Sequence, residues 1–215
     1  MKRKKWWIVL IALLLIVLLG IGGYQAYRFP DTFRSLSDKS ADDKEVGRLV
    51  EQMRDKKDKK VLVAYFSWSA SGNTEKMAKV IQEQTKGDLF EIETAKPYPE
   101  DYEECTEVAK AEKENNERPE LASLPDSIEK YDRIYIGYPI WWHAAPMVIG
   151  TFLESYDLSG IEVYPFSQSA SMDEGQFEES MEFIRKSAGK ANVHDGLFTE
   201  ATNTDAILSY LDKNN

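Results

Sequence analysis

Cysteine and histidine are scarce in this chain of 215 residues. Cys105 is the single cysteine, which excludes an intramolecular disulfide and any metal or iron–sulfur site built from several cysteines. His143 and His194 are the two histidines, so the chain has few nitrogen or sulfur ligands for a zinc site. No Ser-His-Asp or Cys-His constellation is evident. Cys105 falls in a charged stretch, where a helix residue is a simpler interpretation than a nucleophile.

Basic residues are also outnumbered, with 27 Lys and Arg against 37 Asp and Glu and a net charge of −10. Residues 1–30 hold five basic and no acidic residues, so the remainder carries 22 basic against 37 acidic residues. Nucleic-acid binding requires clustered Lys and Arg to neutralise phosphates, so this balance argues against DNA or RNA as a partner. With 42% hydrophobic residues, the chain can still bury the core of one domain.

Charge is absent from Trp6 to Gly23, 18 residues dominated by Ile, Leu and Val. A helix of this length spans about 27 Å, close to the thickness of a bilayer core. Tryptophan and tyrosine flank the segment, as interfacial aromatics do, and Lys2–Lys5 precedes it. We therefore expect residues 1–30 to be a single-pass anchor in the cell membrane, with residues 31–215 on the extracytoplasmic side. A cleaved signal peptide is the alternative.

Residues 31–60 are highly charged and predict a stalk. Val46, Leu49, Val50 and Met53 have helical spacing, so a short amphipathic helix and a solvated linker both remain open.

From Val61 onward, strand and helix patterns alternate. A strand buried on both faces is predicted at 61–66. Further strands are predicted at 89–93, 133–138 and 162–166, with a short fifth strand at 193–198. Helices are predicted at 73–86, 100–115, 148–156, 177–186 and 205–211. This alternation favours an α/β three-layer sandwich with a mainly parallel sheet over residues 61–215. Ligands of such sheets bind beyond the carboxyl ends of the strands.

The first strand is followed by Ser67-Trp68-Ser69-Ala70-Ser71-Gly72-Asn73-Thr74, directly before a helix. Hydroxyls and free amides at a helix N-terminus can hold a phosphate, and a glycine allows close backbone approach. The loop lacks the lysine of a triphosphate-binding loop, so a phosphate monoester is the better match. An ordinary N-capping cluster is the alternative.

The third strand leads into Pro139-Ile140-Trp141-Trp142-His143, and the fourth into Ser167-Gln168-Ser169-Ala170-Ser171. Adjacent tryptophans beyond a strand end offer a flat wall for a planar ring. The small polar residues can hydrogen-bond the edge of a heterocycle, although an ordinary solvent loop remains possible. One of the tryptophans could equally pack in the core.

Ser69-x-Ser71-Gly72-x-Thr74 matches the phosphate signature of flavodoxins, Ser/Thr-x-Thr/Ser-Gly-x-Thr. Further segments that resemble the flavodoxin-like family of short bacterial FMN proteins are Pro97-Tyr98-Pro99-x-Asp101-Tyr102, Arg118-Pro119-x-Leu121, Tyr131-Asp132, Gly137-Tyr138-Pro139-x-Trp141-Trp142 and Thr151-Phe152-Leu153-Glu154. The resemblance runs from about Lys60 to the C-terminus.

This resemblance implies a flavodoxin-like sandwich with a five-stranded parallel sheet in the order 2-1-3-4-5 and non-covalent FMN. It assigns the phosphate to the first loop, the ring to the second and the far edge of the ring to the third. The implied cofactor-binding residues are Ser69, Ser71, Gly72, Asn73, Thr74, Pro139, Ile140, Trp141, Trp142, Ser167, Gln168 and Ser169, with Trp141 as the stacking residue. The third loop departs from the family pattern because it lacks Thr-x-Gly-Gly.

Three functions are compatible with these features. The first is a membrane-anchored FMN electron-transfer protein with an unknown redox partner, since a tryptophan and acidic surroundings disfavour added negative charge on a flavin and lower its potential. The second is an FMN-dependent NAD(P)H:quinone-type reductase. The third is a flavin-free binding module on the same fold.

Overall fold

Val61–Tyr65 forms a buried strand within the apolar run predicted at 61–66. The computed structural model describes residues 59–169, 171 and 173–214. The expected anchor and nearly all of the stalk lie outside these residues. Within them, no helix has both the length and the apolar composition that a membrane crossing requires.

The strands are parallel and lie in the order β2-β1-β3-β4-β5, with β6 pairing β4 beyond β5. The predicted fold and strand order are therefore confirmed. Their bounds are β1 (Val61–Tyr65), β2 (Asp88–Glu91), β3 (Arg133–Pro139), β4 (Glu162–Gln168), β5 (Asn192–Val193) and β6 (Leu197–Phe198).

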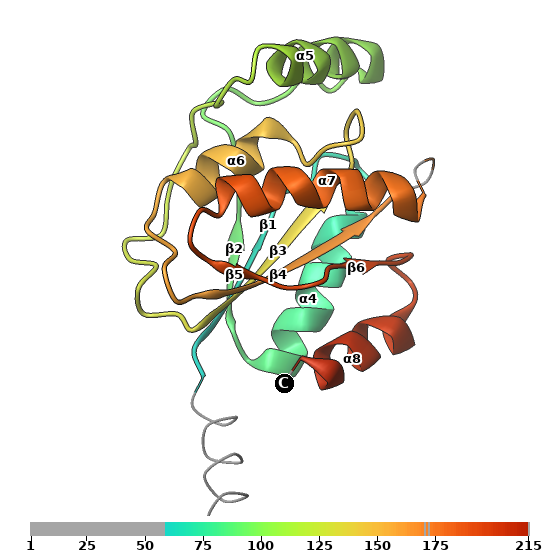
Figure 1. The fold of residues 1–215 in the computed structure, drawn as a ribbon. Helices are drawn as coiled ribbons and strands as arrows, with labels where there is room; N and C mark the ends of the chain where they lie inside the picture. The colour runs from blue at the N-terminus through green and yellow to red at the C-terminus, as the bar shows by residue number, and fades with distance from the viewer. Residues whose placement is uncertain (1–58, 170, 172, 215) are drawn as a thin grey trace, which may run out of the picture. The chain divides into compact units, whose positions relative to one another are not determined.

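Helices cover both faces of the sheet (Figure 1). The helices α6 and α7 lie over one face and α4 and α8 over the other, while α5 lies outermost beside α6. Their bounds are α4 (Asn73–Thr85), α5 (Tyr102–Glu114), α6 (Met147–Glu154), α7 (Glu174–Ser187) and α8 (Thr204–Lys213).

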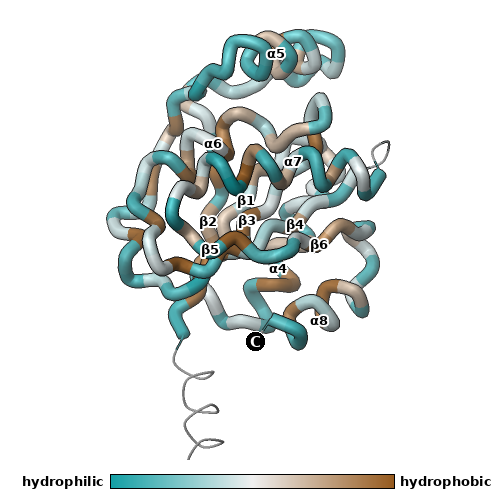
Figure 2. Tube along the Cα trace, viewed as in Figure 1, coloured by the Kyte–Doolittle hydropathy of each residue, from teal (hydrophilic) through white to brown (hydrophobic). Residues whose placement is uncertain are grey.

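The alternation of side chains along β1 produces two hydrophobic cores. Leu62 and Ala64 belong to the core beneath α6 and α7, whereas Val63 and Tyr65 belong to the core with α4 and α8. Figure 2 shows the contrast between these hydrophobic layers and the mainly hydrophilic α5. Because β1 is buried on both faces, the loop that follows it leaves the sheet from a fixed position.

The fifth strand differs from the prediction of one segment at 193–198. It is divided into β5 and β6, which both pair with β4. Between them, the carbonyl of Asp195 accepts a hydrogen bond from the Tyr210 hydroxyl of α8 at 2.9 Å, and the His194 ring stacks on Tyr164. Residues 194–196 lie between the two strands, and the His194 amide still donates to the Val163 carbonyl of β4 at 2.9 Å.

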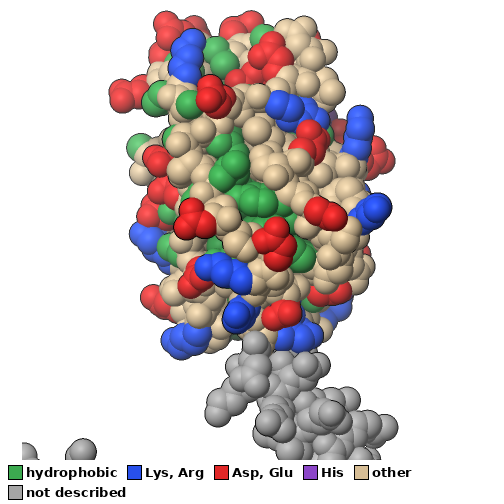
Figure 3. Space-filling model, turned by 90° about the vertical axis from the view of Figure 1, so that its left-hand side faces the viewer, with side chains coloured by type: hydrophobic (Ala, Val, Ile, Leu, Met, Phe, Trp, Pro, Cys, Tyr) green, Lys and Arg blue, Asp and Glu red, His purple; other side chains and the backbone are tan. Residues whose placement is uncertain are grey.

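Figure 3 shows one face of the molecule, on which acidic and basic side chains are interspersed around a strip of hydrophobic side chains. The charges on this face are mixed, so no field of a single sign extends across it.

Candidate functional site

A cavity of about 390 Å³ opens beyond the carboxyl ends of β1, β3 and β4. It falls within the range of roughly 300–1,000 Å³ that is typical of small-molecule sites. The three predicted loops meet here, and α5 closes one side. Ten of the twelve predicted residues line the cavity: Ser69, Ser71, Asn73, Thr74, Pro139, Ile140, Trp141, Trp142, Gln168 and Ser169.

The first loop ends at Gly72, the N-cap of α4, which has a left-handed backbone with φ of 57°. No side chain caps this helix, and the Ser69 and Ser71 hydroxyls hydrogen-bond each other at 2.8 Å. The interpretation of this loop as a capping cluster is therefore wrong. The first-turn amides of α4 remain available as donors, as anion binding at a helix N-terminus requires.

Thr74 is the most buried polar residue of this loop, with 2% of its surface exposed, and it lines the cavity. Gly72 is not part of the lining, but a Cβ at this position would strain the left-handed backbone and lie 3.1 Å from the Glu75 carboxylate. Its role is to shape the loop.

The second loop makes a tight turn in which Trp142 and His143 both have positive φ, 51° and 61°. Trp141 and Ala144 exchange two backbone hydrogen bonds of 2.9 and 3.0 Å across the turn. Left-handed backbone costs roughly 1–2 kcal/mol per non-glycine residue, so other contacts must hold this turn.

Two helices supply those contacts. The Trp142 indole N–H donates to the Thr106 carbonyl of α5 at 3.1 Å, and Lys113 of α5 donates to the Trp142 carbonyl. His143 lies 3.1 Å from both Glu179 and Gln176 of α7. His143 does not line the cavity, and its contacts indicate a role in fixing the turn.

Trp141 and Trp142 have different surroundings, although both line the cavity. Trp141 is half-buried, and Phe66, Trp68 and Tyr98 surround it with ring centroids 5.3, 6.1 and 5.1 Å away in edge-to-face geometry. Trp142 is 38% exposed and has Lys110 over its ring at 5.4 Å. The rigidly packed Trp141 is therefore suited to present a fixed surface to a planar ligand.

The third loop contributes fewer groups than predicted. Ser167 is fully buried and donates to the Tyr138 carbonyl at 2.5 Å, so it joins β4 to β3 and does not line the cavity. Gln168 accepts a weak hydrogen bond from Asn73 at 3.5 Å, which links the third loop to the first. Ser171, at the end of the predicted third loop, also lines the cavity.

Helix α5 supplies a wall that the sequence interpretation missed, because its many charges indicated only a surface helix. The sequence did contain a signal, since the residues that line the cavity have helical spacing: Tyr102, Cys105, Thr106 and Ala109. Burial raises the pKa of the Cys105 thiol to about 11, so it stays protonated at neutral pH. Trp68, from the first loop, is a second unpredicted member of the lining.

The comparisons with known proteins agree with this geometry. The profile of the family described as flavodoxin matches residues 60–214. The chain belongs to the flavodoxin family. No curated protein matches it.

Solved structures of flavodoxin-family relatives resemble this chain closely. A protein of Bacteroides eggerthii assigned as a flavoprotein is 34% identical, with a TM-score of 0.63, over 72% of this chain and 96% of its own. A protein of Bacteroides uniformis, assigned in the same way, is 32% identical, with a TM-score of 0.62, over 72% of this chain and 98% of its own. A flavoprotein of Lactobacillus acidophilus, solved in complex with FMN, is 27% identical, with a TM-score of 0.58, over 68% of this chain and 97% of its own.

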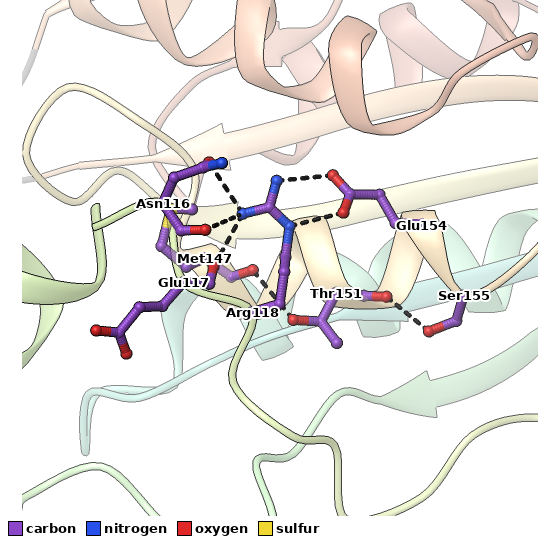
Figure 4. Close-up of polar contacts among 7 residues, drawn as sticks. All are labelled: Asn116, Glu117, Arg118, Met147, Thr151, Glu154 and Ser155. Carbon is purple, nitrogen blue, oxygen red and sulfur yellow. Dashed lines mark hydrogen bonds and ion pairs between the residues drawn. The ribbon is translucent and has the colours of Figure 1, made fainter. Parts of the chain in front are cut away.

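In this flavodoxin-family chain, Arg118 fixes α5 against the rest of the domain (Figure 4). Its guanidinium donates two hydrogen bonds, of 2.7 and 2.8 Å, to the Glu154 carboxylate of α6, and others to the Asn116 and Glu117 carbonyls just after α5. Arg118 also lowers the pKa of Glu154 below its ordinary value. A bidentate pair is geometrically specific, so it holds the end of α5 in place beside the cavity.

A second link to α5 is buried. Glu112 is 9% exposed and accepts a hydrogen bond of 2.7 Å from the Tyr98 hydroxyl. Burial raises the pKa of Glu112 above its ordinary value. Since Tyr98 also packs against Trp141, this bond connects α5 to the aromatic residues at the cavity.

Proposed function

We propose that this chain binds FMN in the cavity and acts as an electron-transfer protein held at the cell membrane by residues 1–30. The observation that carries the proposal is the uncapped N-terminus of α4, where free amides and the Thr74 hydroxyl meet a cavity bounded by tryptophans. A relative solved with FMN supports the choice of ligand.

The chain's residues suit each part of FMN. The α4 amides, Ser69, Ser71, Asn73 and Thr74 would hold the phosphate, and Trp141 or Trp142 would cover the ring. Gln168 and Ser169 would lie along the edge of the ring. When bound, the flavin would supply the redox chemistry, and the protein would bind and orient it and limit its contact with water.

Replacing Thr74 with valine tests the phosphate assignment. A hydrogen bond to a charged group contributes about 1.5–3 kcal/mol, so FMN affinity should fall roughly 10- to 150-fold. Riboflavin lacks the phosphate and should bind Thr74→Val almost as it binds the parent. Titration calorimetry with both ligands measures this difference.

Thr106→Val is the matched control, because Thr106 lines the same cavity from α5, away from the α4 N-terminus. It should affect FMN and riboflavin equally. Equal losses for the two ligands in Thr74→Val would contradict the assignment of Thr74 to the phosphate.

The membrane proposal rests on the uncharged Trp6–Gly23 and the preceding Lys2–Lys5. The full chain should sediment with membranes and resist carbonate extraction, and external protease should remove the flavodoxin-family domain from intact cells stripped of their wall. Recovery of a soluble form lacking Trp6–Gly23 as the main species would show that the segment is a cleaved signal instead.

A further inference from the structure

A second cavity, of about 630 Å³, lies between the first loop and the segment that follows β2. It shares Trp68 with the cavity assigned to FMN, together with the serines on either side of that residue. The two cavities are therefore neighbours along the same loop, but the groups that line the second cavity are chemically different.

The charged side chains that line the second cavity are Glu91, Glu93 and Glu100, all carboxylates. No Lys, Arg or His is among its lining residues. An anionic ligand such as a nicotinamide dinucleotide would be repelled here, whereas a cation would be attracted.

The rest of the lining is mainly apolar and aromatic. Trp68 and Tyr98 take part in it, and both direct their polar atoms to protein partners. The Trp68 indole N–H donates to the Pro99 carbonyl at 2.9 Å, and the Tyr98 hydroxyl donates to Glu112. Their rings, held in place by Trp141, therefore line the cavity as fixed apolar surfaces.

We infer that the second cavity binds a planar aromatic cation, such as an N-alkylated heteroaromatic ring. Aromatic surfaces attract a cation through the ring quadrupole, and carboxylates at the same site add Coulomb attraction. A flat ring also uses the apolar surface of Trp68 and Tyr98, which a small aliphatic ammonium ion cannot cover. This inference is independent of FMN binding, because it rests on the lining of the second cavity alone.

Titration of the purified full chain with 1-methylquinolinium tests the inference, with quinoline at pH 8 as the neutral analogue of the same shape. We expect one binding event, at least about 10-fold tighter for the cation, and weakened by salt. Glu93→Gln and Glu100→Gln should each lower the affinity of the cation roughly 2- to 5-fold without changing that of quinoline. Glu107→Gln, at an exposed α5 carboxylate that lines neither cavity, is the control and should change neither.

The titration is repeated with FMN in excess, and the cation should bind as before. Displacement of 1-methylquinolinium by FMN would show that the two ligands do not bind separate cavities, and it would overturn the inference. Equal affinities for the cation and quinoline would also overturn it, and so would unchanged binding in both glutamine variants. Binding of tetramethylammonium as tight as that of 1-methylquinolinium would show that the cavity does not select a planar ring. A chain that fails to bind FMN but shows the expected cation selectivity would separate this site from the proposed function.

Discussion

Gly137→Ala should destabilise the domain by about 3 kcal/mol or more and abolish ligand binding. Gly137 in β3 is paired directly with Phe166 in β4, and the Phe166 ring lies across it. A Cβ at position 137 would fall 2.2 Å from the Phe166 Cζ atom and 2.4 Å from Cε2. Phe166 is fully buried in the core with α4 and α8, so its ring cannot move aside without displacing other side chains. Overpacking of this kind costs about 1–3 kcal/mol and sometimes more.

Denaturant unfolding followed by far-ultraviolet circular dichroism measures the loss. Gly137→Ala combined with Phe166→Leu should recover part of the stability, because leucine removes the ring atoms that the added methyl would meet. Gly175→Ala is the control, since it lies at an exposed position in the first turn of α7 and should be neutral or slightly stabilising. Parent-like stability of the Gly137→Ala single variant would contradict the packing described for β3 and β4.

Trp141→Ala should weaken FMN binding and destabilise the domain together. Loss of ring stacking is worth about 1–3 kcal/mol, or roughly 5- to 150-fold in affinity. Trp141 also contacts Phe66, Trp68 and Tyr98, so its removal should lower the free energy of unfolding by roughly 3 kcal/mol. Fluorescence of bound FMN, quenched by an adjacent indole in the parent, should partly recover.

Trp142→Ala is the comparison, because Trp142 is more exposed and packs mainly against α5. It should change the unfolding free energy much less than Trp141→Ala. If Trp142→Ala alone alters affinity and quenching, Trp142 is the stacking residue. If neither variant changes FMN binding, neither tryptophan covers the flavin ring.

Trp141→Ala should also raise the reduction potential of the bound flavin. Indole electron density beside the ring makes added negative charge less favourable, and this penalty disappears with Trp141. Potentiometric titration of Trp141→Ala and the parent measures the shift. A lower potential in the variant would contradict a stacked Trp141.

The sequence predicted those parts of the site that depend on chain direction and strand order. Apolar runs located β1, β3 and β4, and the parallel arrangement brings their carboxyl ends to one edge, so the loops at 69–74, 139–142 and 168–169 could be placed together. Gly72 and the uncapped α4 illustrate the limit of this reasoning. The serines of the loop would have suited a helix cap equally well, and the choice between capping and anion binding depends on backbone dihedrals.

Other features depend on tertiary contacts that no local pattern encodes. Ser167 appears polar and exposed in the sequence, but the pleat of β4 turns it toward the Tyr138 carbonyl. The charges of residues 100–115 indicate a solvated helix, but the Arg118–Glu154 pair and the Tyr98–Glu112 hydrogen bond hold α5 beside the cavity. The pattern at 193–198 predicts one strand, whereas the Asp195 carbonyl between β5 and β6 accepts a hydrogen bond from Tyr210 of α8.

We propose above that this chain holds FMN as an electron carrier. The most direct test of this proposal is the absorbance spectrum of the full chain, loaded with FMN and freed of excess ligand, recorded without oxygen after addition of NADPH and then of dithionite. We predict that yellow FMN remains bound, that NADPH leaves the spectrum unchanged and that dithionite bleaches it. Rapid bleaching by NADPH would contradict the account in favour of a reductase, and absence of bound FMN would contradict it altogether.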